Sequence, residues 1–231
     1  PGLPVTVLGN GVGLGYAPAG PAHEATEDLA YMRSLPGMEI WSPSNSPQVA
    51  ALARLTQNKP ALRYLRLERN LPKALMSYAD QVVDPTSSSP SKLEPMGFVG
   101  VVEANPAVAL LSSGYLLGRA LEVASQLRSR NVAANVIEVS RLKPLDAVQL
   151  MAHIGEAQLC VTLEEQFPDG GFGSAILESL SDMQQSRPVL RLGLPREFVF
   201  QNGLREDLLD LSGLSTTEIE KEVLLRLEQI S

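Results

Sequence analysis

The sequence predicts an α/β protein with two consecutive open, mostly parallel sheets, each covered by helices. In both halves of the chain, short apolar runs alternate with segments of helical periodicity, and a serine- and proline-rich stretch, "DPTSSSPSKLEPMGF", separates the halves. A chain of 231 residues with 44% hydrophobic residues can bury two modest cores. We therefore expect a first unit at residues 1–80, a linker at 81–104 and a second unit at 105–231.

The first unit shows the order strand, helix, strand, helix, strand. Its opening apolar run, residues 3–9, predicts a buried strand. A helical period follows Glu24 and stops at Pro36, because proline cannot continue a helix. The other expected elements are a strand in "MEIWSPS" (38–44), a helix in "SPQVAALARLTQN" (46–58) started by its serine and proline, and a strand in "PALRYLRL" (60–67).

The second unit repeats this alternation. Its expected strands are "AVALLSSG" (107–114), "VAANVIEVS" (132–140), "QLCVTLEE" (158–165) and "PVLRLGL" (188–194). Its expected helices are "YLLGRALEVASQLRSR" (115–130), "LDAVQLMAHIGEA" (145–157), "GFGSAILESLSDM" (171–183) and the terminal "TTEIEKEVLLRLEQI" (216–230), which opens with threonine before glutamate.

Composition narrows the class of partner. The chain carries 19 basic and 26 acidic residues, a net charge of −7, which repels nucleic acid and anionic membranes. No apolar run is long enough to span a bilayer, so we expect a cytoplasmic protein that binds a small molecule or another protein. Cys160 lies in an apolar run and reads as a small buried side chain, and His23 and His153 belong to no metal-binding motif.

The loop "GNGVGLGYAPAGPAHEATED" (9–28) invites interpretation as a phosphate cradle. The G-x-G-x-x-G spacing fails, because Leu14 and Tyr16 stand where the third glycine would be, and no G-K-[ST] motif occurs. The open alternatives are a mobile loop and a substrate loop with His23 at its tip.

The segment "GPAHEATEDLAYMRSLPGMEIWSPSN" (20–45) resembles the thiamine-diphosphate-dependent transketolase family. So do, in the family's order, "RLKPLD" (141–146), "VTLEEQFPDGGFGSAILESL" (161–180) and "LGLPREF" (192–198). The resemblance implies part of a pyrimidine-binding domain followed by the family's C-terminal domain.

The resemblance also implies site residues. His23 matches the family histidine that reaches toward the donor substrate, where it can hydrogen-bond an oxygen and move a proton. Arg66 falls near the family arginine that binds the substrate phosphate, with Arg69 as the alternative. The alternatives stay open: His23 could be hydrogen-bonded only to the backbone, and Arg66 and Arg69 could form surface ion pairs. Ala19 stands where family members place an aspartate that contacts a sugar hydroxyl, which puts the usual sugar phosphates in doubt.

Other charged residues match family positions with structural roles. For Glu27, Asp28 and Arg33 we expect capping, dipole or subunit contacts. Glu164 and Glu165 end a strand and point to opposite faces, so they cannot act on one bond together. The glycines that follow them are expected to allow close backbone approach.

The resemblance implies thiamine diphosphate and Mg²⁺ as cofactors, but no G-D-G…N motif for the diphosphate occurs in this sequence. The implied partner is an N-terminal diphosphate-binding subunit or domain, in a hetero-oligomer such as a dimer of heterodimers. Residues of this chain that bind the cofactor are not identified. Because the sequence opens on Pro1 directly before a strand, we expect an incomplete view of a longer polypeptide from a split enzyme, with a lone fragment or a degenerate relative as alternatives.

The implied function is transfer of a two-carbon ketol unit, with the chain inactive on its own. Two alternatives remain. One is a decarboxylating component of the deoxyxylulose-phosphate synthase or 2-oxo-acid dehydrogenase beta type, which "RLKPLD" fits. The other is a non-catalytic scaffold subunit.

Overall fold

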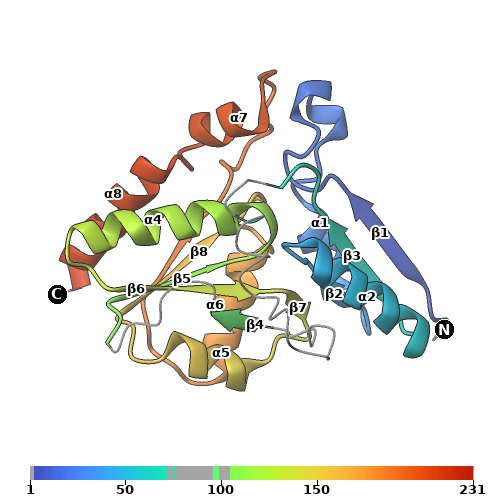
Figure 1. The fold of residues 1–231 in the computed structure, drawn as a ribbon, viewed down its shortest axis with the longest axis horizontal. Coiled ribbons are helices and arrows are strands. Elements are labelled where there is room, and N and C mark those ends of the chain that lie inside the picture. Colours follow the sequence, from blue (N-terminus) through green and yellow to red (C-terminus); the bar gives the residue numbers. More distant parts are fainter. Residues whose placement is uncertain (1–2, 72–74, 76–95, 99–104, 231) are drawn as a thin grey trace.

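The computed structural model describes residues 3–71, 75, 96–98 and 105–230, which form two mostly parallel sheets with flanking helices (Figure 1). The predicted α/β class and its strand–helix alternation are confirmed. Most of the predicted linker lies outside the described residues. Residues 96–98 within it form a strand.

The first sheet has the strand order β1-β3-β2-β7. Three of its strands are parallel, and the fourth, β7, runs antiparallel to β2. Its strands are β1 (Thr6–Asn10), β2 (Glu39–Trp41), β3 (Arg63–Leu67) and β7 (Arg141–Lys143), and its helices are α1 (Asp28–Ser34) and α2 (Ser46–Asn58). Since β7 comes from the second half of the sequence, the two halves share this sheet.

The start of α2 differs from the prediction. The helix is capped by Asn45, whose side chain accepts a hydrogen bond from the Gln48 backbone N–H at 2.9 Å, rather than by the serine that follows. Asparagine is among the best N-capping residues because its short side chain reaches the free N–H groups of the first turn.

The apolar run predicted a buried strand, but β1 is mostly exposed. Four of its five residues are exposed, and Leu8 is 61% exposed. The reason is topological: β1 lies at the edge of the first sheet, paired on one side with β3.

The second sheet is larger and has the order β4-β6-β5-β8-β9, with only β4 antiparallel. Helices α4 and α8 pack on one face, and α5 and α6 on the other (Figure 1). Its strands are β4 (Met96–Phe98), β5 (Val108–Ser112), β6 (Ala134–Val139), β8 (Leu159–Leu163) and β9 (Val189–Leu192). The helices are α4 (Leu117–Ser129), α5 (Ala147–Ile154), α6 (Phe172–Asp182), α7 (Arg205–Leu211) and α8 (Thr216–Ile230).

The cores of the two sheets are continuous. Ile40 and Tyr64 of the first sheet belong to the same buried cluster as Leu111 and Ile137 of the second. The glycine-rich loop also joins the second sheet, because Leu14 and Ala17 are fully buried in the cluster under α4.

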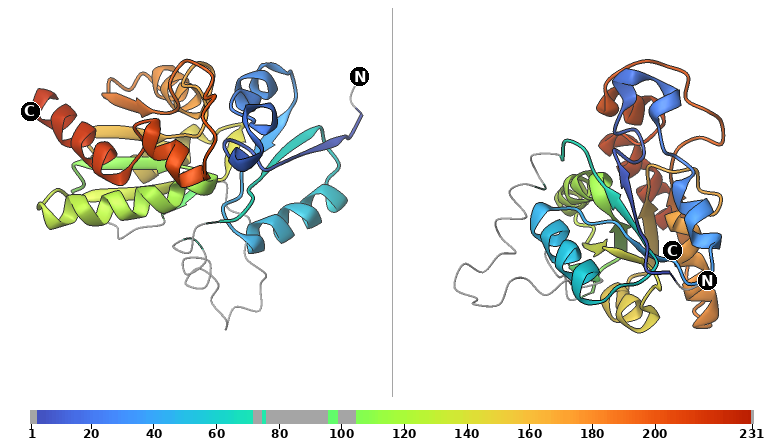
Figure 2. Two further views of the ribbon diagram at one scale, coloured as in Figure 1. Left: turned by 90° about the horizontal axis from the view of Figure 1, so that it is seen from above. Right: turned by 90° about the vertical axis from the view of Figure 1, so that its right-hand side faces the viewer.

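The glycine-rich loop is folded and lies against α7. Gly13 and Ala25 exchange backbone hydrogen bonds of 3.0 Å, and two 3₁₀ turns, η1 (Ala17–Ala19) and η2 (Pro21–His23), lie between them. Figure 2 shows these turns, in blue, beside the orange-red segment that leads into α7. Within the described part of the chain, no helix has the length and apolar character needed to cross a membrane.

Candidate functional site

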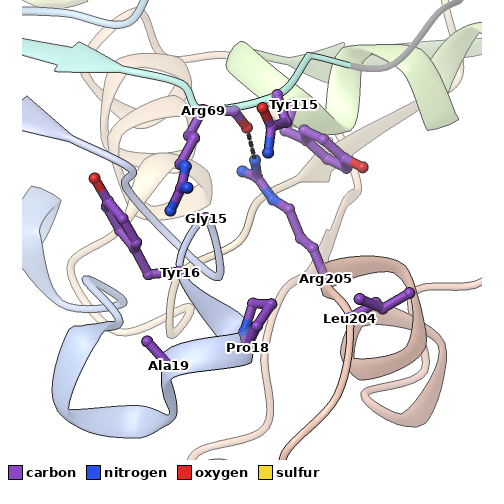
Figure 3. Close-up of a pocket in the computed structure, with 9 residues that line it drawn as sticks. Gly15, Tyr16, Pro18, Ala19, Arg69, Tyr115, Leu204 and Arg205 are labelled. Atoms are coloured by element: carbon purple, nitrogen blue, oxygen red, sulfur yellow. Dashed lines mark hydrogen bonds between the residues drawn. The ribbon is translucent and has the colours of Figure 1, made fainter.

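A pocket of about 360 Å³ lies where the glycine-rich loop, the end of β3 and the start of α7 meet (Figure 3). The loop follows β1, and the 3₁₀ turn η3 (Gly114–Leu116) follows β5, so the pocket lies past the carboxyl ends of strands from both sheets. Ligand sites of open α/β sheets concentrate at this edge. The lining residues are Gly15, Tyr16, Pro18, Ala19, Arg69, Asn70, Tyr115, Leu204 and Arg205.

One glycine of the loop, Gly11, makes room for the tyrosine ring of the pocket. A Cβ added to Gly11, whose φ is +73°, would lie 2.1 Å from a ring carbon of Tyr16. The Tyr16 hydroxyl accepts a hydrogen bond of 3.2 Å from the Asn10 side chain. Gly11 therefore serves the packing of Tyr16.

Arg69 is the arginine that the structure brings to the pocket. Its guanidinium carbon lies 4.4 Å from the centroid of the Tyr16 ring, an attractive cation–π arrangement. The side chain is exposed, and among the described residues no ion pair involves it. Its charge is therefore available to an anion.

Arg66 lies elsewhere. The side chain is 2% exposed and is held by Asp28, with Nε donating to Oδ2 at 2.6 Å and Nη2 to Oδ1 at 3.2 Å. A third bond of 3.3 Å reaches the Ser42 hydroxyl, and the Tyr64 hydroxyl donates to the same Asp28 carboxylate at 2.7 Å. Burial and the Asp28 charge raise the pKa of Tyr64. These contacts make Arg66 and Asp28 a buried structural pair, outside the residues that line the pocket.

His23 is exposed at the tip of the loop and does not line the pocket. Its Nδ1 lies 3.2 Å from the carbonyl oxygen of Ala19, which does line the pocket. Because a carbonyl only accepts, this bond places the proton on Nδ1 and leaves Nε2 as the lone-pair nitrogen of the neutral ring. The backbone contact is thus present, and the catalytic role stays a prediction.

Arg33 and Glu27 make local and cross-sheet contacts. Arg33 donates to the carbonyls of Gly170 at 2.7 Å and Gly171 at 3.2 Å, and pairs with Glu178 of α6. Glu27 accepts a 2.9 Å bond from the Thr26 hydroxyl. Arg33 therefore ties α1 to the loop before α6.

Glu164 and Glu165 point away from each other, as predicted. The Glu164 carboxylate accepts the N–H groups of Phe172 at 2.6 Å and Gly173 at 2.9 Å at the start of α6. Burial raises its pKa to about 7. A Cβ on Gly171 would lie 2.2 Å from this carboxylate, which confirms the expected close approach.

Glu165 faces the pocket side and joins a buried charge cluster that sequence analysis missed. Arg205 pairs there with Glu165 and with Glu68, and its guanidinium lies 3.6 Å from the centroid of the Tyr115 ring. Burial raises the pKa of Glu165. No local pattern signals this cluster, because Arg205 and Glu68 lie 137 residues apart in the sequence.

Metal and thiol chemistry find no support in the described part of the chain. It holds no group of three histidine, cysteine, aspartate or glutamate residues that could bind a metal ion. Cys160 is fully buried, and burial raises the pKa of its thiol to about 11, which confirms it as an inert apolar side chain.

Two family models match the chain. The one described as "Transketolase, pyrimidine binding domain" matches residues 1–73, and "Transketolase, C-terminal domain" matches residues 97–219. Together they account for both sheets.

Curated relatives cover most of the chain. The 1-deoxy-D-xylulose-5-phosphate synthase of Rhodopirellula baltica is 33% identical over 221 residues, which are 94% of this chain and 32% of the relative. That of Caldanaerobacter subterraneus subsp. tengcongensis is 28% identical over 214 residues, or 91% and 32%. An uncharacterized transketolase family protein of Sinorhizobium fredii is 29% identical over 216 residues, or 92% and 58%. The chain thus spans about a third of the synthases' length.

Solved structures give the same picture. A chain described as "Split gene transketolase, inactive beta4 tetramer" matches with a TM-score of 0.77 and 27% identity, covering 98% of this chain and 67% of its own. A transketolase mutant from Pichia stipitis matches with a TM-score of 0.71 and 13% identity, covering 97% of this chain and 30% of its own, which shows the fold alone.

Proposed function

Because this chain belongs to the transketolase family, we propose that it is the C-terminal component of an enzyme that transfers a two-carbon ketol unit. The family is thiamine-diphosphate dependent. The pocket of Arg69 and Tyr16 at the strand ends carries the proposal, because it presents a guanidinium that forms no ion pair with the described residues at the edge where α/β folds bind ligands.

The described residues do not fit the diphosphate end of the cofactor, since they contain no metal-binding cluster. We propose that Mg²⁺ and the diphosphate are held by an N-terminal diphosphate-binding chain or domain, in a hetero-oligomer such as a dimer of heterodimers. When bound there, thiamine diphosphate supplies the electron sink for cleaving a carbon–carbon bond. This chain contributes groups on the substrate side.

Arg69 is proposed to bind an anionic group of the substrate. Its guanidinium is held over the Tyr16 ring at 4.4 Å, so its planar fork is oriented before an anion arrives. Charge-assisted bonds from arginine to phosphate or carboxylate are among the strong hydrogen bonds of proteins. A small anionic substrate follows from this arrangement.

His23 is proposed to move a proton at the substrate. The bond from Nδ1 to the Ala19 carbonyl orients the ring and leaves Nε2 as the proton acceptor. There it can take the proton of the donor hydroxyl as that oxygen becomes the carbonyl of the departing aldehyde, and return it to the carbonyl oxygen of the acceptor aldehyde as that oxygen becomes a hydroxyl. Ala19 supplies no side-chain acceptor beside it, so a substrate hydroxyl at this position would lack a partner from this residue.

The second candidate is a decarboxylating enzyme of the deoxyxylulose-phosphate synthase type. It is favoured by the identity of 28–33% to proteins of that name over about nine tenths of this chain. Release of carbon dioxide from pyruvate by the reconstituted complex separates it from ketol transfer.

The test is reconstitution of the chain with a diphosphate-binding N-terminal transketolase subunit. His23→Ala is expected to lower turnover about 10²-fold, as loss of a positioned acid or base does. Arg69→Gln is expected to raise KM with little change in kcat. The matched controls are His153→Ala, on the far helix α5, and Arg196→Gln, an exposed arginine paired with Asp169.

Unchanged turnover in His23→Ala would remove the catalytic role of that residue. Thiamine diphosphate affinity, measured by calorimetry on the complex, tests the enzyme proposal as a whole. A complex that does not bind the cofactor would instead support the scaffold alternative.

A further inference from the structure

Arg205 occupies the junction between the two sheets, at the wall of the pocket. It is the first residue of α7, and its buried side chain reaches between Glu68, just past the end of β3, and Glu165, just past the end of β8. Figure 3 shows Arg205 opposite Tyr16, with its guanidinium close to the backbone of Arg69.

Protein acceptors already satisfy the guanidinium of Arg205. Its Nε donates to Glu165 Oε1 at 2.8 Å, and its Nη2 donates to Glu68 Oε2 at 2.7 Å and to the second oxygen of Glu165. Two buried carboxylates therefore neutralise its charge, and the ring of Tyr115 covers its face. An arginine bound in this way has little left to offer a ligand directly.

The remaining hydrogen bond of Arg205 is to the backbone of Arg69, the arginine proposed to bind the substrate anion. Its Nη1 donates to the backbone carbonyl of Arg69 at 3.2 Å, drawn as the dashed line in Figure 3. The neighbouring Glu68 carboxylate also accepts the Tyr115 backbone N–H at 3.2 Å. The end of β3 is thus anchored to α7 and to η3, both from the second half of the chain.

The carboxylates of Glu68 and Glu165 are closely packed against the backbone of two glycines. A Cβ added to Gly13 would lie 2.4 Å from Glu165 Oε2, and one added to Gly114 would lie 2.2 Å from Glu68 Oε1. Both glycines have positive φ, +61° and +60°, which other residues rarely adopt. The backbone at the two glycines therefore packs closely against the two carboxylates.

We infer that Arg205 is a positioning residue for substrate binding: it fixes the end of β3 so that the Arg69 guanidinium stays over Tyr16 and faces the pocket. This inference rests on the proposed anion-binding role of Arg69. Arginine is required at position 205, because the N–H groups of one planar guanidinium point in different directions and so reach Glu68, Glu165 and the Arg69 carbonyl at the same time. A lysine ammonium cannot reach all three.

The test is the affinity of the full chain for inorganic phosphate, measured by calorimetry together with the melting temperature. Arg69→Gln is expected to abolish phosphate binding. Arg205→Lys, which keeps the charge but not the fork, is expected to weaken it about tenfold through lost preorganisation. In the reconstituted complex the same variant is expected to raise KM and leave kcat unchanged.

The control is Arg119→Lys, because Arg119 of α4 anchors the same helix without touching the pocket. It donates to Asp210 at 2.7 Å and pairs with Glu206, both in α7. This variant is expected to lower the melting temperature and leave phosphate affinity unchanged. If Arg205→Lys fails to fold, Glu68→Asp keeps the negative charge but shortens the reach to Arg205, and it is expected to weaken phosphate binding about threefold.

Each outcome has a distinct meaning. Weakening in Arg205→Lys alone supports positioning. Unchanged affinity in Arg205→Lys, or equal weakening in Arg119→Lys, overturns the inference and leaves the role of Arg69 in place. Unchanged affinity in Arg69→Gln removes the anion-binding role in the proposed function, and the positioning role with it.

Discussion

The two sheets differ in how completely their strands are covered. Every residue of β5, β6 and β8 in the second sheet is buried, whereas β1 of the first sheet is mostly exposed. Yet the loop after β1 and the end of β3 carry the pocket. The second sheet contributes the bulk of the hydrophobic core, whereas segments that follow strands of the first sheet supply Tyr16 and Arg69 to the pocket.

The largest expected effect concerns this difference in burial. Leu110→Ala, in the centre of β5, is expected to lower the free energy of unfolding by about 4 kcal/mol, because a fully buried leucine leaves a cavity. Leu8→Ala in β1, at 61% exposure, is expected to cost less than about 1 kcal/mol. Urea denaturation of both variants measures the contrast, and similar losses would mean that β1 is covered in solution.

A smaller effect tests whether the buried ion pair of Arg66 and Asp28 stabilises the first sheet. Asp28→Asn leaves the buried Arg66 guanidinium without its counter-charge and is expected to cost about 3 kcal/mol. The control is Asp169→Asn, which breaks the exposed pair with Arg196 and is expected to cost less than about 0.5 kcal/mol. Equal destabilisation in denaturant titrations would contradict the buried pair.

The smallest effect is a pH dependence at Glu164, next to the junction of the sheets. Burial raises its pKa from an ordinary 4.5 to about 7, so between these values the folded chain keeps a proton that the unfolded chain releases. Stability from this group therefore falls as pH rises through that window. Glu164→Gln cannot titrate, so its stability relative to the native chain is expected to improve by about 2 kcal/mol from about pH 5 to about pH 8.

Melting curves across that pH range measure the difference between the two proteins. Glu122→Gln, at an exposed glutamate of α4, is the control and is expected to show no such trend. A constant difference between Glu164→Gln and the native chain would show that the two N–H groups of α6 keep Glu164 ionised.

Most of the alternation of strands and helices could be predicted, because apolar runs and helical periods are local. The strands β4 and β7 were missed since three residues carry no periodicity, and β7 forms only by pairing with β2. The helix α7 was also missed. Its seven residues are held by long-range bonds from Arg119 and Tyr115 rather than by a local pattern.

The site was predictable only in part. The loop with His23 and the pair of arginines were singled out, but the choice between Arg66 and Arg69 depends on Asp28, which lies 38 residues from Arg66 in the sequence. No sequence pattern identified Tyr16, Tyr115 or Arg205 as pocket residues, because they come from segments that meet only in the folded chain.

The sequence by itself determined the α/β class and the failure of the glycines as a phosphate cradle, because spacing and periodicity are properties of neighbouring residues. Its motifs also resembled those of the transketolase family, which the two family models confirm. Tertiary structure alone decided that β1 is an exposed edge, that Arg66 is buried against Asp28, and that Arg69 is held beside the pocket by Arg205. Burial and ion pairing depend on which distant segments pack together, and that is settled only when both sheets close around a common core.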